Sequence, residues 1–294
     1  NMPRSKSPWD GRIEELRHQH PVAAMSRVLD VSESGYHAWH KRPPSVHTQQ
    51  NARLEVEIKA AHQRTRETYG PERLQAFLAD NGIQVGIHRI KRMRKKLGLR
   101  CKQKRKFKAT TDSNHALPVA PNLLDRQFAV AAPNKAWVTD ITYIATQEGW
   151  LYLAVLLDLY SRTVVGWSMQ KRMTKALVMQ AWQMACAWRH PPEAMLHHSD
   201  LGSQYTSKAY LDLLREKNCE ISMSGKGNCY DNACVESFFS TLKAECADAV
   251  FESRSEARNR IFDYIEVWYN RKRLHSTLGY LSPLEYEIRG ACVQ

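Results

Sequence analysis

Three absences narrow the classes of protein to which this chain can belong. It contains no run of about 18 apolar residues and no recognisable signal peptide, so the sequence gives no support for membrane insertion or secretion. Its seven cysteines include no CxxC pair, and an odd count of this kind predicts free thiols in a reducing compartment. We therefore expect a cytoplasmic protein with no membrane partner.

Acidic residues are also scarce in the first part of the chain. Residues 1–125 hold 24 Lys and Arg against 12 Asp and Glu, whereas residues 126–294 hold 19 against 18. Nearly all of the net charge of +13 therefore lies before residue 126. Because neutralising phosphates releases counterions, we expect this part to bind DNA; a solvated linker or a solubilising tail is the alternative.

The most basic segment runs from residue 89 to residue 108, with 12 basic residues and no acidic one. Ile90, Met93 and Leu97 keep helical spacing, which predicts an amphipathic helix with basic side chains facing outward. These side chains could contact phosphates, and the arginines could also read bases. The candidate DNA-binding residues of this segment are Arg89, Arg92, Lys96, Arg100, Lys104 and Arg105.

Residues 11–45 have the pattern of a helix-turn-helix. The turn falls at Asp30, and Ser32 is placed to cap the helix that follows. The second helix of such a unit can enter a major groove, although a plain helical hairpin would give the same pattern.

A second helical module is expected at residues 52–108, after a polar linker that ends near Asn51. Its predicted helices cover residues 54–65 and 71–82 and then the basic segment. Polar and proline residues predict an extended linker at 109–130.

Residues 131–250 alternate between strand and helix patterns, and a further helix with a basic extension follows at 251–290. The order predicts an α+β fold built on a mixed five-stranded sheet with helices on both faces. Strands are expected at 136–144, 150–158, 162–170, 195–200 and 220–223, and helices at 174–189, 207–217 and 254–270 and around Glu236.

Three carboxylates lie on separate elements of this region. Asp140 lies in a strand, Asp200 follows a short strand that a turn at Gly202 ends, and Glu236 opens a helix that Asp231 or Asn232 could cap. Three carboxylates that face one point suit a hard divalent cation such as Mg²⁺, for which Mn²⁺ can substitute. The chain has 30 acidic residues, and any one of them is usually a helix cap or a solvated side chain. The prediction of a metal site therefore rests on the three acids together.

Other side chains near these acids could touch DNA. Lys243 shares a helical face with Glu236, and it is either a phosphate contact or an ordinary surface lysine. Lys226 and Asn228 lie in a loop where Gly225 and Gly227 permit close approach of backbone to a strand.

The motifs around the three acids are similar to those of a known family. WVTDITY, HSDLGSQY and DNACVESFFSTLK, with 35 residues between the last two acids, resemble the D, D and E motifs of the integrase catalytic core. Together with LLDLYSRTVVGW and YNRKRLHSTLGYLSPLEYE, they resemble the second-reading-frame transposase of the insertion sequence three family of bacterial elements. The resemblance covers nearly all of the chain after residue 20.

This resemblance implies a ribonuclease H-like core. It makes Asp140 the first acid of the site rather than Asp158, which we expect to anchor a turn through Arg162. Retroviral integrases carry an amino-terminal zinc module, but no cysteine precedes Cys101 here, so we expect no zinc.

The implied activity is that of a metal-dependent DNA transposase. Asp140, Asp200 and Glu236 would hold two Mg²⁺ ions, free a 3′ hydroxyl at an element end and direct it at another phosphodiester. The resemblance also implies that the DNA substrates are terminal inverted repeats and target DNA, and that the active form is a dimer or higher oligomer. It further implies a circular intermediate and fusion to an upstream helix-turn-helix protein. A catalytically silent DNA-binding relic and a structure-specific nuclease of the same fold are the alternatives.

Overall fold

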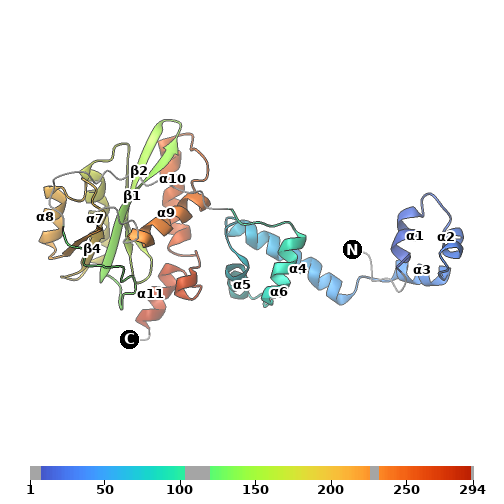
Figure 1. The fold of residues 1–294 in the computed structure, drawn as a ribbon. Helices are drawn as coiled ribbons and strands as arrows, with labels where there is room; N and C mark the ends of the chain where they lie inside the picture. Colours follow the sequence, from blue (N-terminus) through green and yellow to red (C-terminus); the bar gives the residue numbers. More distant parts are fainter. Residues whose placement is uncertain (1–7, 103–119, 226–231, 293–294) are drawn as a thin grey trace. The chain divides into compact units, whose positions relative to one another are not determined.

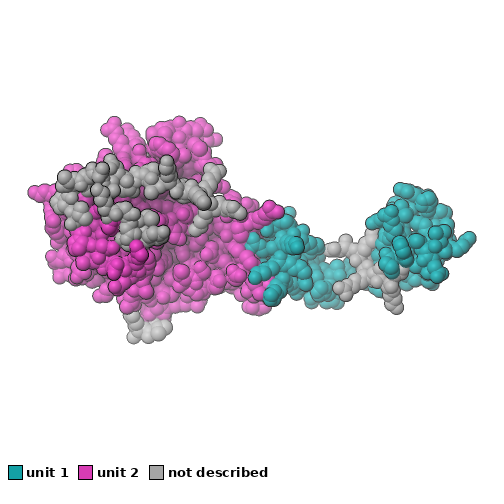
Figure 2. Space-filling model, in the orientation of Figure 1, with its two compact units in different colours: residues 1–61, 88–99 teal, residues 62–87, 100–294 magenta. Residues whose placement is uncertain are grey.

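The computed structural model describes residues 8–102, 120–225 and 232–292 (Figure 1). The chain divides into two compact units: unit 1 comprises residues 1–61 and 88–99, and unit 2 comprises residues 62–87 and 100–294 (Figure 2). Among the described residues, no helix combines the length and the apolar character that crossing a bilayer requires.

Unit 1 begins with the three short helices α1 (Asp10–Leu16), α2 (Val22–Val28) and α3 (Glu33–Lys41). Their shared core consists of Ile13, Met25, Tyr36 and Trp39. The Ser32 hydroxyl accepts a hydrogen bond from the backbone N–H of Gly35 at 3.1 Å, which confirms the predicted cap of α3. The helical pattern of this segment is therefore confirmed, while its role in DNA binding stays a prediction.

The polar linker that we predicted up to Asn51 is wrong, because helix α4 already begins at Val46 and continues to Arg64. The Ser45 hydroxyl accepts a hydrogen bond from the backbone N–H of Thr48 at 3.2 Å, so it caps the first turn of α4. A polar sequence that follows a capping serine can thus start a helix.

The other two predicted helices of this region are present. Helix α5 (Pro71–Asp80) belongs to unit 2 and begins with proline at its first position. Helix α6 (Ile87–Lys96) belongs to unit 1 and buries Ile90 and Met93, as the amphipathic pattern predicted.

Unit 2 contains one sheet of five strands in the order β3-β2-β1-β4-β5. β1 pairs with β2, and β2 with β3, in antiparallel fashion, whereas β4 is parallel to both β1 and β5. The predicted mixed sheet is therefore confirmed. The strands are β1 (Ala136–Thr146), β2 (Gly149–Asp158), β3 (Val164–Gln170), β4 (Leu196–Ser199) and β5 (Glu220–Met223).

Helices cover both faces of this sheet, as Figure 1 shows. Successive side chains of β2 alternate between two cores: Leu153 and Val155 join the core of α9 (Ala233–Glu245) and α10 (Arg254–Asp263), whereas Ala154 and Leu156 join that of α7 (Lys175–Arg189) and α8 (Lys208–Glu216). Because both faces of β2 are buried, the strand is apolar nearly throughout.

The helix that we predicted to run from residue 254 to residue 270 changes its pitch along its length. α10 ends at Asp263, and a π-helical segment, η2, covers Tyr264–Tyr269. Asn270 follows it, accepting a hydrogen bond from the backbone N–H of Val164 at 2.9 Å and donating one to its carbonyl at 3.0 Å. The π-helical segment, whose turns are wider than those of an α-helix, thus ends next to Asn270, which fixes this helix to β3. A short 3-10 helix, η3 (Ser276–Leu278), and α11 (Pro283–Ala291) complete the unit.

Close packing between β3 and α7 makes Gly166 a sensitive position. A Cβ atom there would lie 2.4 Å from the carbonyl oxygen of Ala181 and 2.7 Å from the Cβ atom of Ala185. We expect Gly166→Ala to lower the free energy of unfolding by about 1–3 kcal/mol, because the helix must move away from the sheet. Urea unfolding measures this change. Gly86→Ala, which meets nothing within 4 Å, is the matched control, and equal effects of the two substitutions would contradict the packing explanation.

Candidate active site

Asp140 and Asp200 come from neighbouring parallel strands. Val138 on β1 lies opposite His198 on β4. Asp140 lies two residues after Val138, and Asp200 lies two residues after His198, just beyond the end of β4. Asp140 also lies on the same face of β1 as Val138, which belongs to the core shared with α9. The sheet register therefore places both acids beside each other, near the face that α9 covers.

A turn at Gly202 holds the second acid in place. β4 ends at Ser199, as predicted, and one carboxylate oxygen of Asp200 accepts a hydrogen bond from the backbone N–H of Gly202 at 2.9 Å. A Cβ atom at Gly202 would lie 3.0 Å from that same oxygen. Glycine is therefore suited to this position because it lets the backbone approach the carboxylate closely.

The third acid, Glu236, lies in the first turn of α9 and its side chain is exposed. The helix is fixed to the sheet beside Asp140, because the side-chain amide of Asn232 donates a hydrogen bond to the backbone carbonyl of Thr139 at 3.1 Å. Of the two residues that we predicted could cap α9, Asn232 makes no capping bond with its side chain. Asp231, the other candidate cap, lies outside the described residues.

The acids influence one another electrostatically. The pKa of Asp140 is raised well above its ordinary value by burial, and the charges of Asp200 and Glu236 raise it further. A 2.7 Å hydrogen bond from the backbone N–H of Ile141 and the positive charge of Lys243 oppose this rise. Burial also raises the pKa of Glu236. Like charges gathered in this way would be stabilised by a cation.

Lys243 lies close enough to Asp140 for the two charges to interact. Burial lowers the pKa of the Lys243 ammonium group, and the charge of Asp140 partly offsets this decrease. The side chain is half-buried rather than fully solvated, which favours a site role over an ordinary surface lysine.

The donor set fits a hard divalent cation. Carboxylate oxygens are the ligands that Mg²⁺ prefers, and three of them come from β1, the turn after β4 and α9. Within the described ranges, no three His, Cys, Asp or Glu side chains already lie close enough to hold a metal ion.

Tyr205 is a neighbour of the site that the sequence did not reveal. Its buried hydroxyl lies 3.3 Å from that of Thr139, which in turn donates to the carbonyl of Val155 at 2.8 Å. Burial raises the pKa of Tyr205, and Asp140 and Asp200 raise it further. Tyr205 is the last residue of the HSDLGSQY motif, but its spacing of five residues from Asp200 does not predict a contact across the turn.

Asp158 anchors a turn, as expected, and the backbone N–H of Arg162 donates a hydrogen bond to the backbone carbonyl of Asp158 at 2.8 Å. Its carboxylate accepts hydrogen bonds from the backbone N–H groups of Asn134 and Tyr160 at 2.7 and 2.8 Å, and it lies 3.5 Å from the Arg189 guanidinium. Burial raises its pKa to about 6. The guanidinium of Arg162 is directed to the sulfur of Cys234 and the carbonyl of Phe128.

Only part of the predicted DNA-binding surface faces solvent. Arg92 and Arg100 are exposed, whereas Arg89 is half-buried and donates two hydrogen bonds to the Asn51 side chain at 2.7 and 3.1 Å. Our prediction that Arg89 faces outward is therefore wrong. Lys96 is exposed but forms an ion pair with Glu55. The remaining candidates, Lys104, Arg105, Lys226 and Asn228, lie outside the described residues.

The basic cluster at residues 271–275 is largely structural. Arg273 is buried and bonds to Glu245 at 2.9 Å, so its side chain is held inside the fold. Arg271 donates to the carbonyl of Glu266 at 3.0 Å, so this side chain caps the end of the preceding helical segment.

Comparison with known protein families agrees with this architecture. Models described as "Integrase core domain" match residues 130–229 and 236–290, and a model described as "HTH-like domain" matches residues 49–107. The chain thus combines an integrase core domain with a helix-turn-helix-like region.

Individual relatives define the family more narrowly. The chain is 54% identical over 263 residues to the "Insertion element IS600 uncharacterized 31 kDa protein" of Shigella sonnei, covering 89% of this chain and 97% of that protein. It is 44% identical over 278 residues to "Transposase InsF for insertion sequence IS3" of Escherichia coli, covering 94% and 96%. This chain belongs to the IS3 family of transposases.

Among solved structures, the chain is similar to the catalytic core domain of HTLV-2 integrase in complex with magnesium. That domain is 16% identical, covers 53% of this chain and 97% of its own, and superposes with a TM-score of 0.40.

Proposed function

We propose that this transposase uses Asp140, Asp200 and Glu236 to hold Mg²⁺, or Mn²⁺ in its place, while it cuts and joins DNA. The observation that carries the proposal is the parallel register of β1 and β4, which sets two carboxylates side by side next to α9. When bound there, the cations would stabilise charge on the attacking and leaving oxygens of an in-line phosphoryl transfer.

The protein groups around the acids have separate tasks in this proposal. Gly202 orients the Asp200 carboxylate, and Asn232 fixes the start of α9, so two of the three acids are positioned by backbone contacts. Lys243 lies near Asp140 and can bind a phosphate of the reacting strand. No covalent link between protein and DNA is required, because the reacting hydroxyl belongs to water or to the DNA itself.

The same site would perform two successive reactions in the bacterial cytoplasm. Water first releases a 3′ hydroxyl at an element end, and that hydroxyl then attacks a second phosphodiester. The substrates are the terminal inverted repeats and a target duplex. Since two ends must be held together, a dimer or higher oligomer is the expected active form, and association with an upstream helix-turn-helix protein would add further contacts to DNA.

The test uses labelled duplexes that carry the terminal repeats, incubated with the full chain and Mg²⁺ or Mn²⁺. We expect joined strands whose formation stops when EDTA removes the divalent cation. Cleavage without joining would instead assign a structure-specific nuclease. Binding with neither cleavage nor joining would assign a catalytically silent relic.

A further inference from the structure

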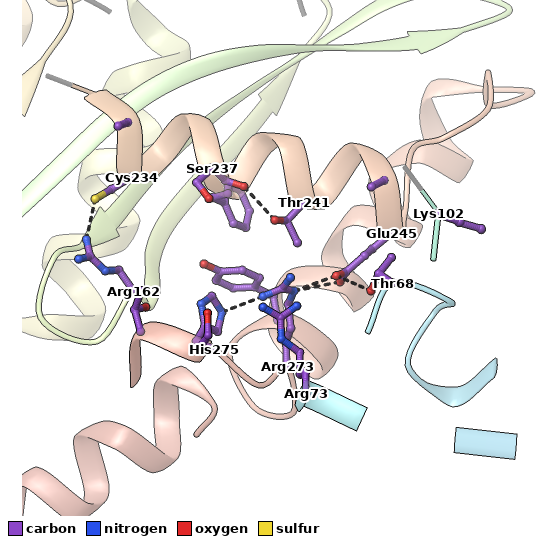
Figure 3. A pocket seen from close by; sticks show the side chains of 16 residues that line it. Thr68, Arg73, Lys102, Arg162, Cys234, Ser237, Thr241, Glu245, Arg273 and His275 are labelled. Carbon is purple, nitrogen blue, oxygen red and sulfur yellow. Dashed lines mark hydrogen bonds and ion pairs between the residues drawn. The ribbon is translucent and has the colours of Figure 1, made fainter. Parts of the chain in front are cut away.

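A second polar site lies in unit 2, along the face of α9 that carries Cys234, Ser237 and Thr241 (Figure 3). It is a cavity of about 370 Å³, within the size range of small-ligand sites. Ser237 and Thr241 line it one helical turn apart, whereas Glu236, Ser240 and Lys243 follow the other face. Its charged lining residues are Arg73, Lys102, Arg162, Glu245 and Arg273.

The lining carries more positive than negative charge. Four arginine and lysine side chains face one carboxylate, that of Glu245. This carboxylate is already bonded to Arg273 at 2.9 Å, and Lys102 is paired with Asp248 at 3.0 Å. Arg73 and Arg162 therefore remain as the cations whose charge no acidic group of the described chain neutralises through an ion pair.

Arg73 is held in an environment that suits an anion. Its guanidinium lies 5.1 Å from the ring centre of Tyr69, and its buried Nε–H group has no hydrogen-bond partner among the described residues. Burial lowers the pKa of Arg73, and the adjacent positive charge of Arg273 lowers it further. Figure 3 shows the two guanidinium groups next to each other.

His275 and Arg162 lie in the same positively charged environment. The pKa of His275 is lowered well below its ordinary value by burial, then by Arg273, Arg73 and Arg162. The hydrogen bonds of the Arg162 guanidinium to described residues go to neutral groups, the sulfur of Cys234 and the carbonyl of Phe128. A bound anion would relieve the repulsion among these cations.

We propose that this pocket binds a phosphate group of the DNA backbone through Arg73 and Arg162. Guanidinium groups with spare N–H donors and serine or threonine hydroxyls are the side chains that contact phosphates in protein–DNA complexes. Both kinds line the cavity, and most of the hydroxyls come from α9 and η3. The choice of DNA as the source of the phosphate rests on the proposed function. A strand held here would lie across the helix that carries Glu236, which would help to fix that helix during the reaction.

The first test measures affinity for duplex DNA in EDTA, using the full chain as wild type, Arg73→Gln and Arg162→Gln. We expect each substitution to weaken binding about 3- to 10-fold for every DNA sequence and to reduce the slope of log K against log[salt] by about 1. Arg215→Gln, on the exposed surface of α8, is the matched control and should leave both quantities unchanged. Because no divalent cation is present, this result does not depend on whether cutting and joining occur.

The second test separates ligand binding from structural support by measuring Tm without DNA. Inorganic phosphate should raise the Tm of the wild type more than chloride at equal ionic strength, and Arg73→Gln should abolish this difference. The Tm of ligand-free Arg73→Gln should equal or exceed that of the wild type, since the substitution removes a desolvated charge that faces Arg273.

Three results would overturn the proposal. One is unchanged DNA affinity and salt slope in both variants. Another is a lower Tm of ligand-free Arg73→Gln, which would assign the arginine to packing against Tyr69. The third is stabilisation by inorganic phosphate without any change in DNA affinity, which would assign the pocket to a free oxyanion instead of DNA.

Discussion

Asp200→Asn is expected to reduce both strand cleavage and strand joining by about 10³-fold or more, which corresponds to about 4 kcal/mol of activation free energy. Asparagine removes the negative charge that a divalent cation requires and replaces one oxygen donor by an amide. The turn itself should persist, because the remaining side-chain oxygen can still accept the hydrogen bond from Gly202. Rates are measured with labelled element ends in Mg²⁺.

Folding and metal binding can be separated in the same variant. Asp200→Asn removes a negative charge that acts on half-buried Asp140, so the Tm of the metal-free protein should stay the same or rise. The increase in Tm that Mg²⁺ causes in the wild type should be lost. Asp212→Asn, which changes an exposed acid of α8, should retain activity and the Mg²⁺ effect. Joined products that persist in Asp200→Asn would refute the assignment of this acid.

Most of the sheet could be predicted because its strands carry local signals. β1 and β2 are rich in apolar and β-branched residues, and clear turn residues bound the short strands β4 and β5. The short spacing between β1, β2 and β3 also indicated a meander. The parallel pairing of β1 with β4, which brings Asp140 to Asp200, depends on packing between distant segments and has no local signal.

The contacts that could not be predicted are those of charged and polar side chains whose partners are distant in the sequence. Arg89 had the spacing of an exposed basic residue, yet Asn51 lies 38 residues away and accepts its hydrogen bonds. Arg273 stood in a basic run, yet Glu245 lies 28 residues before it and holds it inside the fold. Periodicity predicts which face of a helix is polar, but it cannot predict which charge a remote acid will neutralise.

Glu245→Ala is expected to lower the free energy of unfolding of unit 2 by about 3–5 kcal/mol, because it would leave the buried Arg273 cation without its partner. The Glu245 carboxylate also accepts hydrogen bonds from the side chains of Thr68 at 2.9 Å, Tyr264 at 3.1 Å and Trp268 at 2.9 Å. Tyr264 and Trp268 would lose this acceptor together, whereas the Thr68 hydroxyl could still donate to the carbonyl of Thr65 at 3.1 Å. Urea unfolding measures the loss, and Glu216→Ala on the exposed surface of α8 should change stability by no more than about 0.5 kcal/mol.

A double substitution distinguishes the loss of attraction from the isolation of a buried charge. If the stranded guanidinium causes most of the instability, Glu245→Leu combined with Arg273→Met should be clearly more stable than Glu245→Leu alone, since no unpaired charge remains. If the attraction itself dominates, the double variant should be at least as unstable as the single one. Full recovery is not expected, because Tyr264 and Trp268 would still lack the acceptor that Glu245 provides.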